Sequence, residues 1–454
     1  MQPSKSLLNL ETLVHVWDRI RSSLWFVPGL MVAATLLLAM MTPRIDRMIP
    51  AGWLSDLPII FSGAPVNART VLSTIATSMI TIAGVVFSMT IVSLQLASSQ
   101  FGPRLLRTFL RDTANQVVLG TFVATFLYCI VILPSVDSRT DAIFVPQLSV
   151  TIAIVLAVIS LGMLVFFIDH VAQSIHADAV IQSVATELDY VIDDLYPANG
   201  AENEGLAHAG TGNGMADEEV TPDSLDQATG TVHAPRSGYI RFINRQGLLQ
   251  VANEMDLVIR LLVLPGAFVM RDQAIASVAL HSKASGDYSA EIRQAFGIGT
   301  HRTALQDVRF AFEQLSEMAI RALSPGINDP TTATHCVNRI GAGLVRLVER
   351  APERRLCRDE GGTVRVVVER LTLADLLSHT MIPIARNAGR HIEVWTRMLH
   401  VLQVSHERSQ TDTYRDAIGA CGLCVADMAE GSFESTHDIE QLRDAAAWAK
   451  AGSD

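Results

Sequence analysis

The stretch TVLSTIATSMITIAGVVFSMTIVSLQLASSQFGPR, from Thr70 to Arg104, decides the fold of this chain. Most of its residues are apolar, and no charged side chain interrupts it before Arg104. A helix of this length is long enough to cross the hydrocarbon layer of a bilayer, which is roughly 30 Å thick. The stretch therefore predicts a membrane-spanning helix.

Polar side chains recur along this helix every three or four residues, so they share one face. They are Thr70, Thr74, Thr77, Thr81, Ser88, Gln95 and Ser99, with Gly84 in the same row. Hydrocarbon offers no partner for a polar group, so such a stripe is expected to face protein or water. The helix is thus expected either to pack against protein or to line an aqueous path.

Composition and further apolar runs extend this interpretation. Hydrophobic residues make up 49% of the 454 residues and charged residues only 18%. Four apolar runs are long enough to span a bilayer. They are approximately Leu24–Met41, Val71–Ser93, Val117–Leu133 and Leu148–Ile168. The sequence predicts an α-helical multi-pass membrane protein with four transmembrane helices in residues 24–170.

Basic residues orient these spans, because loops rich in Lys and Arg stay in the cytoplasm. The N-terminal tail (residues 1–23) and the loop after the second run carry Lys5, Arg19, Arg21, Arg104, Arg107 and Arg111. The loop after the third run carries only Arg139. Three arginines in the first loop reduce this contrast without reversing it. We therefore expect four crossings with both termini in the cytoplasm.

The rest of the chain is expected to form a cytoplasmic α+β region. Residues 171–198 continue the fourth span as a helix, and residues 199–230 form an acidic flexible linker without Lys or Arg. Residues 231–285 show short apolar runs separated by turn residues, which predicts a small β-sandwich or barrel. Helical spacing returns in residues 286–454, which are expected to be mainly helical.

The densest polar motif is Ser324-Pro-Gly-Ile-Asn-Asp-Pro-Thr-Thr. Asn328 or Asp329 is suited to cap the next helix, with Pro330 in its first position. Capping alone accounts for every residue type in the motif. Alternatively, Ser324, Asn328, Asp329, Thr331 and Thr332 gather polar groups at a helix N-terminus for an anion or a partner loop.

Few other features predict chemistry. The sequence has no Walker glycine loop, no zinc-protease motif and no nucleophile elbow, so we predict no catalytic residue, cofactor or metal site. Cys421 and Cys424 form a lone C-x-x-C, which favours helix packing. Glu313, Glu317 and Arg321 are expected to lie on a solvated helix face. The net charge of −11 argues against nucleic acid as a partner.

Four stretches resemble one family of bacterial membrane proteins, catalogued as domain of unknown function 2254. They are Trp17-Asp-Arg-Ile-Arg-Ser-Ser-Leu-Trp-Phe-Val-Pro, Ala97-Ser-Ser-Gln-Phe-Gly-Pro-Arg-Leu-Leu-Arg, Gln116-Val-Val-Leu-Gly-Thr-Phe and Ala322-Leu-Ser-Pro-Gly-Ile-Asn-Asp-Pro. The resemblance extends over nearly the whole chain. It implies a multi-pass inner-membrane protein with a cytoplasmic C-terminal part. It brings no established activity and therefore no catalytic residues.

Three functional hypotheses follow. The first is a homo-oligomeric channel or transport-like protein for a small ion or solute, in which the polar stripe lines the path and Arg104, Arg107 and Arg111 form a basic mouth. The second treats the stripe as a helix-packing face of a scaffold or sensor that acts through its cytoplasmic domain. The third is an unfamiliar membrane enzyme that uses Asn328, Asp329 and His335.

Overall fold

The computed structural model describes residues 25–48, 60–101, 113–136, 144–174, 176–196, 230–280, 288–351 and 355–451. The chain divides into two compact units, Met1–Ala179 and Val180–Asp454. The tail in residues 1–23 and nearly all of the linker in residues 199–230 lie outside the described residues. We call the two units the N-terminal unit and the C-terminal unit.

Long apolar helices make up the N-terminal unit. They are α2 (Phe26–Met48), α3 (Pro65–Phe101), α5 (Thr113–Ile132) and α6 (Gln147–Ser174), with a short 3-10 turn, η1, at Leu133–Ser135. Among the residues that the structure describes, these four helices are long and apolar enough to cross a membrane. They coincide with the four apolar runs in the sequence, so the predicted helices are confirmed. The structure contains no membrane, and the spanning itself is inferred from length and composition.

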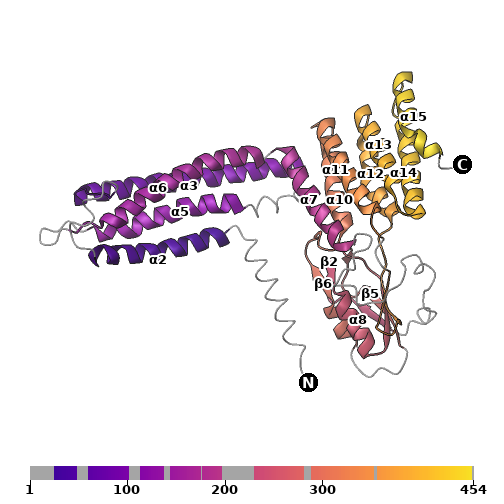
Figure 1. Ribbon diagram of the computed structural model, residues 1–454, viewed down its shortest axis with the longest axis horizontal. Helices are drawn as coiled ribbons and strands as arrows, with labels where there is room; N and C mark the ends of the chain where they lie inside the picture. The colour runs from indigo at the N-terminus through magenta and orange to yellow at the C-terminus, as the bar shows by residue number, and fades with distance from the viewer. Residues whose placement is uncertain are drawn as a thin grey trace. The chain divides into compact units, whose positions relative to one another are not determined.

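Helix α5 lies at the centre of this unit and packs against α2, α3 and α6 (Figure 1). Gly120 brings α5 close to α2, since a Cβ there would lie 2.7 Å from the sulfur of Met31. Phe122 and Tyr128 of α5 are fully buried. The outer surfaces of α3 and α6 expose large apolar side chains, among them Phe87 and Leu161. Such a surface suits a lipid environment, in which exposed apolar groups carry no cost.

The fourth span and the helix after it are separate elements. Helix α6 ends at Ser174 and α7 spans Ala177–Leu195, whereas the sequence predicted one continuous helix. The amide of His176 donates to the carbonyl of Gln173 and its carbonyl accepts from Ala179, which marks the change between the two helices. Asp178 lies in the first turn of α7, where a negative charge stabilises a helix start.

The C-terminal unit contains two sheets within its described residues. The strands are β1 (Gly230–His233), β2 (Gly238–Ile243), β3 (Leu257–Leu261), β4 (Phe268–Val269), β5 (Ala274–Leu280), β6 (Phe296–Gly299), β7 (Leu356–Arg358) and β8 (Val364–Val367). The first sheet has the order β1-β5-β3-β8-β7 and the second β4-β2-β6. Among the described strands, β3 and β8 pair in parallel and the other pairs are antiparallel. Both sheets contribute to one apolar core, to which Ile240, Ile259 and Ile298 belong.

The small β domain is therefore assembled from a longer part of the chain than residues 231–285. Strands β6, β7 and β8 come from the region expected to be mainly helical, and β8 joins the sheet through β3. Val366 of β8 is buried in the same core as Ile259. Short helices α8 (Arg245–Glu254) and α9 (Tyr288–Gln294) also belong to this layer. Pairing between strands that are far apart in the sequence buries apolar side chains together, and no local sequence pattern predicts such a contact.

The described part of this unit contains six further helices. They are α10 (Val308–Ala322), α11 (Pro330–Val348), α12 (Leu373–Asn387), α13 (Ile392–Arg408), α14 (Asp412–Glu430) and α15 (Thr436–Ala451). Helix α11 packs against both α10 and α13 (Figure 1). Two of its glycines permit the close contacts, because a Cβ at Gly341 would lie 2.5 Å from Val401, and one at Gly343 would lie 2.5 Å from Leu188 of α7.

Candidate functional site

The polar stripe of α3 lies on the side of the helix that faces away from the rest of the N-terminal unit. Helix α3 buries one face, made of Ala68, Leu72, Ala76, Met79, Ala83 and Val86. At about 100° per residue, the stripe lies nearly opposite this face. Thr70, Thr74, Thr77, Thr81, Ser88 and Gln95 are all exposed. No other helix of the same chain covers the stripe in the described part of this unit.

Hydrogen bonds within α3 satisfy the hydroxyl donors of four residues of the stripe. The hydroxyls of Thr74 and Thr81 each donate to the carbonyl four residues earlier, at 2.8 Å. Thr70 and Ser88 do the same at 2.9 Å. A hydroxyl bound in this way needs no external donor or acceptor to lie at a lipid surface. The stripe therefore needs protein or water beside it less strictly than the sequence suggested.

Part of the predicted path and mouth cannot be placed. Ser99 belongs to α3, but its side chain is not among the described features. Arg104, Arg107 and Arg111 lie outside the described residues. The basic mouth therefore stays a prediction from the sequence.

A buried polar network connects α2 to the beginning of α6, and sequence reasoning missed it. The carboxylate of Asp46 accepts hydrogen bonds from the amide of Leu148 at 2.9 Å and from the amide and hydroxyl of Ser149 at 3.0 and 2.6 Å. Asp46 is only 8% exposed. Its charge lies at the N-terminus of a helix, where free amides and the helix dipole stabilise an anion.

Tyr128 of α5 extends the same network. Its hydroxyl lies 3.0 Å from the hydroxyl of Thr42 and donates to the carbonyl of Ser149 at 3.2 Å. Asp46, Thr42, Tyr128 and Ser149 thus join three helices. We call these four residues the buried network. Each of its four side chains has a hydrogen-bond partner inside the protein, so the arrangement suits helix fixation and leaves no vacant ligand position.

The turn between α10 and α11 holds the motif that begins at Ser324. The carboxylate of Asp329 accepts from the amide of Thr332 at 3.0 Å and from its hydroxyl at 2.6 Å, and Pro330 is the first residue of α11. The helix cap predicted at Asp329 is confirmed. Thr331 is exposed, and Ser324 donates its hydroxyl to the carbonyl of Arg321. Within the motif, the side chains of Asp329 and Thr332 thus bind each other, whereas that of Ser324 binds the preceding helix.

Asn328 has a longer-range contact. Its φ of 53° lies in the left-handed region, which Asn tolerates better than most residues. Its side-chain oxygen lies 3.0 Å from Nε2 of His391, at the start of α13. Burial acts to raise the pKa of Asp329, but the hydrogen bonds from Thr332 outweigh it and hold the pKa below its usual value. An ionised, capped carboxylate does not favour a role for Asp329 as a catalytic acid or base.

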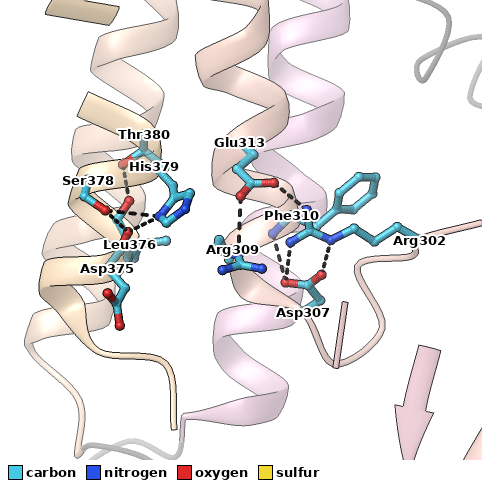
Figure 2. Close-up of polar contacts among 10 residues, drawn as sticks. All are labelled: Arg302, Asp307, Arg309, Phe310, Glu313, Asp375, Leu376, Ser378, His379 and Thr380. Atoms are coloured by element: carbon cyan, nitrogen blue, oxygen red, sulfur yellow. Dashed lines mark hydrogen bonds and ion pairs between the residues drawn. The ribbon is translucent and has the colours of Figure 1, made fainter. Parts of the chain in front are cut away.

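The most enclosed charge cluster of the C-terminal unit surrounds Arg302 (Figure 2). Its guanidinium donates to Asp307 at 2.5 and 3.2 Å and to Glu313 at 2.5 Å. The side chains of Arg302 and Asp307 are 14% and 3% exposed. Asp307 also caps α10 through the amide of Phe310. Burial opposes the charge on Arg302, but hydrogen bonds and attraction from both carboxylates raise its pKa.

Sequence reasoning assigned Glu313 to a solvated helix face, whereas the structure places it against Arg302 and Arg309. The Pro265-Gly266 turn lies against the same cluster, because a Cβ at Gly266 would overlap the carboxylate of Asp307. Gly266 also has a positive φ of 87°. No local spacing links residues 266, 302 and 313, so only the fold reveals the cluster. Every carboxylate oxygen of Asp307 and Glu313 has a partner, which favours a structural role for the cluster.

Within the described residues, no group of three or more His, Cys, Asp or Glu side chains is placed to hold a metal ion. Another polar group lies on α12, where Nδ1 of His379 is 2.7 Å from the carbonyl of Asp375 and 3.1 Å from the hydroxyl of Ser378 (Figure 2). The hydroxyl of Ser378 donates to the same carbonyl, so His379 does not activate it as a nucleophile.

Comparison with known proteins places the chain in a family. Residues 21–404 match the family described as "Predicted membrane protein (DUF2254)". The chain belongs to this family. The DUF2254 description agrees with the four long apolar helices and names no activity. The resemblance seen in the sequence motifs is therefore confirmed.

Two relatives of this DUF2254 protein are uncharacterized proteins of Mycobacterium bovis and Mycobacterium tuberculosis. Each is 31% identical over 440 residues, which cover 95% of this chain and 81% of the relative. No solved structure matches the chain. The similarity thus extends through both units, and the function has to be argued from the geometry.

Proposed function

We propose that this protein is a homo-oligomeric channel or transport-like protein of the bacterial inner membrane, in which α3 borders the path of a small ion or solute. The observation that carries the proposal is the position of the hydroxyl stripe opposite the buried face of α3. A stripe in this position is free to meet the same stripe of a second copy. Copies arranged around an axis would turn these hydroxyls toward one another.

The hydrogen bonds of the stripe indicate what such a path would offer a solute. Each donated hydroxyl hydrogen is used by the helix itself, as at Thr74 and Thr81. The hydroxyl oxygen still has a free lone pair, so it acts as an acceptor. A row of acceptors suits water or a cation, whereas the predicted arginine mouth would attract anions. Flux of both K⁺ and Cl⁻ therefore has to be measured.

The test uses purified full-length protein in liposomes. Thr74→Val plus Thr81→Val removes two oxygens from the stripe and keeps the side-chain shape. We expect ion flux to fall at least about fivefold, since the path loses polar contacts. The matched control is Thr90→Val, because Thr90 makes the same bond to the carbonyl four residues earlier but is half-buried outside the stripe. Equal flux in all three proteins would remove the stripe from the mechanism.

A second candidate function is supported by the same hydrogen bonds. Because the hydroxyls are satisfied within α3, small side chains such as Gly84 and Ser88 are also suited to close helix packing. The protein would then be a membrane scaffold or sensor that acts through its C-terminal unit. Cysteine cross-linking between copies at residue 81, together with no flux above that of empty liposomes, would favour this candidate.

A further inference from the structure

Helix α7 is the covalent connection between the two units, because the chain passes from one to the other once, at Ala179 and Val180. One side of the helix is buried within the C-terminal unit. The buried residues are Val180, Ile181, Val184, Ala185, Leu188, Val191 and Ile192. Because α7 follows α6 directly along the chain, the way in which α7 is held within the C-terminal unit bears on both proposed functions.

The middle of α7 is held by apolar packing. Leu188 is 1% exposed, and a Cβ at Gly343 of α11 would lie 2.5 Å from the Cδ2 of Leu188. Phe312 of α10 lies beside the same glycine. This part of the contact depends on burial and close approach, and salt has little effect on either.

At the C-terminal end of α7, ion pairs add to the burial of Val191 and Ile192. Arg346 of α11 donates to Asp193 at 2.5, 2.8 and 3.0 Å, and Arg350 donates to the same carboxylate. Arg350 also donates to the carbonyls of Ile192 and Tyr196. The carbonyl of Ile192 also accepts a hydrogen bond from the amide of Tyr196, so Arg350 adds a second donor at this end of the helix.

The two ends of this contact differ in exposure. The side chains of Asp193 and Arg346 are 44% and 42% exposed, whereas Arg350 is 15% exposed and Leu188 is buried. Exposed ion pairs are screened by salt and contribute little on their own. We propose that Arg346 and Arg350 form a releasable clasp, which fixes the last turn of α7 to α11 while the apolar contact around Leu188 holds independently. The clasp determines how firmly the last turn of α7 is held against α11.

The test is hydrogen–deuterium exchange of the full-length protein in detergent micelles. In Arg346→Met plus Arg350→Met, we expect the protection of amides 192–196 to fall about tenfold, because charged hydrogen bonds to Asp193 and to the last carbonyls are lost. Protection at Val184 and Leu188 should stay within about twofold of the unaltered protein. About 1 M NaCl should reproduce part of the effect in the unaltered protein.

The matched control is Arg408→Met, which removes an exposed ion pair with Glu349, at 3.1 Å, close to the end of α11. This variant should leave exchange in α7 unchanged. The proposal is overturned if amides 192–196 keep their protection in the double variant, or if protection is lost equally along the whole of α7. If the double variant does not fold, the salt titration of the unaltered protein tests the proposal instead. Protection of amides 192–196 that does not change with salt would then contradict the clasp.

Discussion

The stripe on α3 and the buried network of the same unit use the same kinds of side chain in opposite ways. In the stripe, threonine and serine hydroxyls are exposed and bind carbonyls of their own helix. In the buried network, Thr42, Tyr128, Ser149 and Asp46 bind groups on other helices. Local bonds leave a face available for a partner, whereas bonds between helices hold the unit together.

The C-terminal unit repeats this contrast with charges. Arg302 is enclosed with Asp307 and Glu313 at the joint between the sheets and α10, whereas Asp193 and Arg346 are more than 40% exposed. Breaking a buried ion pair leaves an uncompensated charge, while an exposed pair is replaced by water. The comparison therefore predicts a ranked series of effects on stability.

The largest effect is expected for Arg302→Met. This change leaves Asp307 and Glu313 without their shared partner and should lower the free energy of unfolding by about 3 to 5 kcal/mol. Chemical unfolding of the full chain in micelles, followed by circular dichroism, measures it. Arg309→Met is the control, because Arg309 binds only the Glu313 side of the cluster, at 3.3 Å, and is more exposed. Equal losses in both variants would contradict the special role of the enclosed arginine.

The second-largest loss of stability is expected for Asp46→Ala. It removes three hydrogen bonds and the negative charge at the start of α6, which predicts a loss of about 2 to 3 kcal/mol. The same unfolding measurement applies, compared with Arg44→Ala, whose side chain is exposed and donates only to the carbonyl of Met40 in its own helix. A stability unchanged from the unaltered protein would mean that the network does not join α2 to α6.

Tyr128→Phe tests the network without altering charge. The ring stays, but the contact with Thr42 and the donated bond to Ser149 disappear, and about 1 to 2 kcal/mol of stability should be lost. Thermal unfolding in micelles is sensitive enough to detect this shift. An increase in stability would indicate that burying the hydroxyl costs more than its two contacts return.

A smaller, acid-dependent effect is expected at Asp193. Burial acts to raise its pKa, but hydrogen bonds from Arg346 and the charges of Arg350 and Arg346 lower it below 3.8. Its stabilising contribution is therefore complete above pH 3.8 and is lost as the pH falls through the lowered value. Asp193→Asn should abolish this acid-side loss, which is less than about 1 kcal/mol for an exposed pair. Unfolding between pH 5 and 2 would reveal it, and an identical pH dependence in both proteins would contradict it.

The smallest effect on stability belongs to Thr81→Val on the stripe. Only a bond to the carbonyl of Thr77 is lost, and that carbonyl remains part of the helix, so stability should change by less than about 0.5 kcal/mol. The Tyr128→Phe variant provides the comparison in the same assay. A loss as large as that of Tyr128→Phe would show that the exposed stripe already stabilises the protein, as expected if copies contact one another there.

Much of the local structure could be predicted from particular residues. Asp329 and Pro330 marked the start of α11, and the uninterrupted apolar run after Val71 marked α3. The continuous helix beyond residue 170 was not correct, because the polar sequence around His176 starts a new helix. The boundary at residue 285 also differed, since strand β8 pairs with β3 from more than 100 residues away. The spacing of apolar residues predicts a single helix or strand, but it does not predict which distant element packs against it.

The sequence by itself determined that the chain contains four long apolar helices, a hydroxyl face on α3 and a capped turn after Ala322, because each depends on residues within a few turns of one another. Only the tertiary structure decided that the hydroxyl face points away from the rest of the unit and that Asp46 stabilises the start of α6. It also decided that Arg302 lies in an enclosed charge cluster, whereas Arg346 lies in an exposed one. The physical reason is that burial and charge pairing depend on which distant segments of the chain contact one another. A local sequence pattern does not predict those contacts.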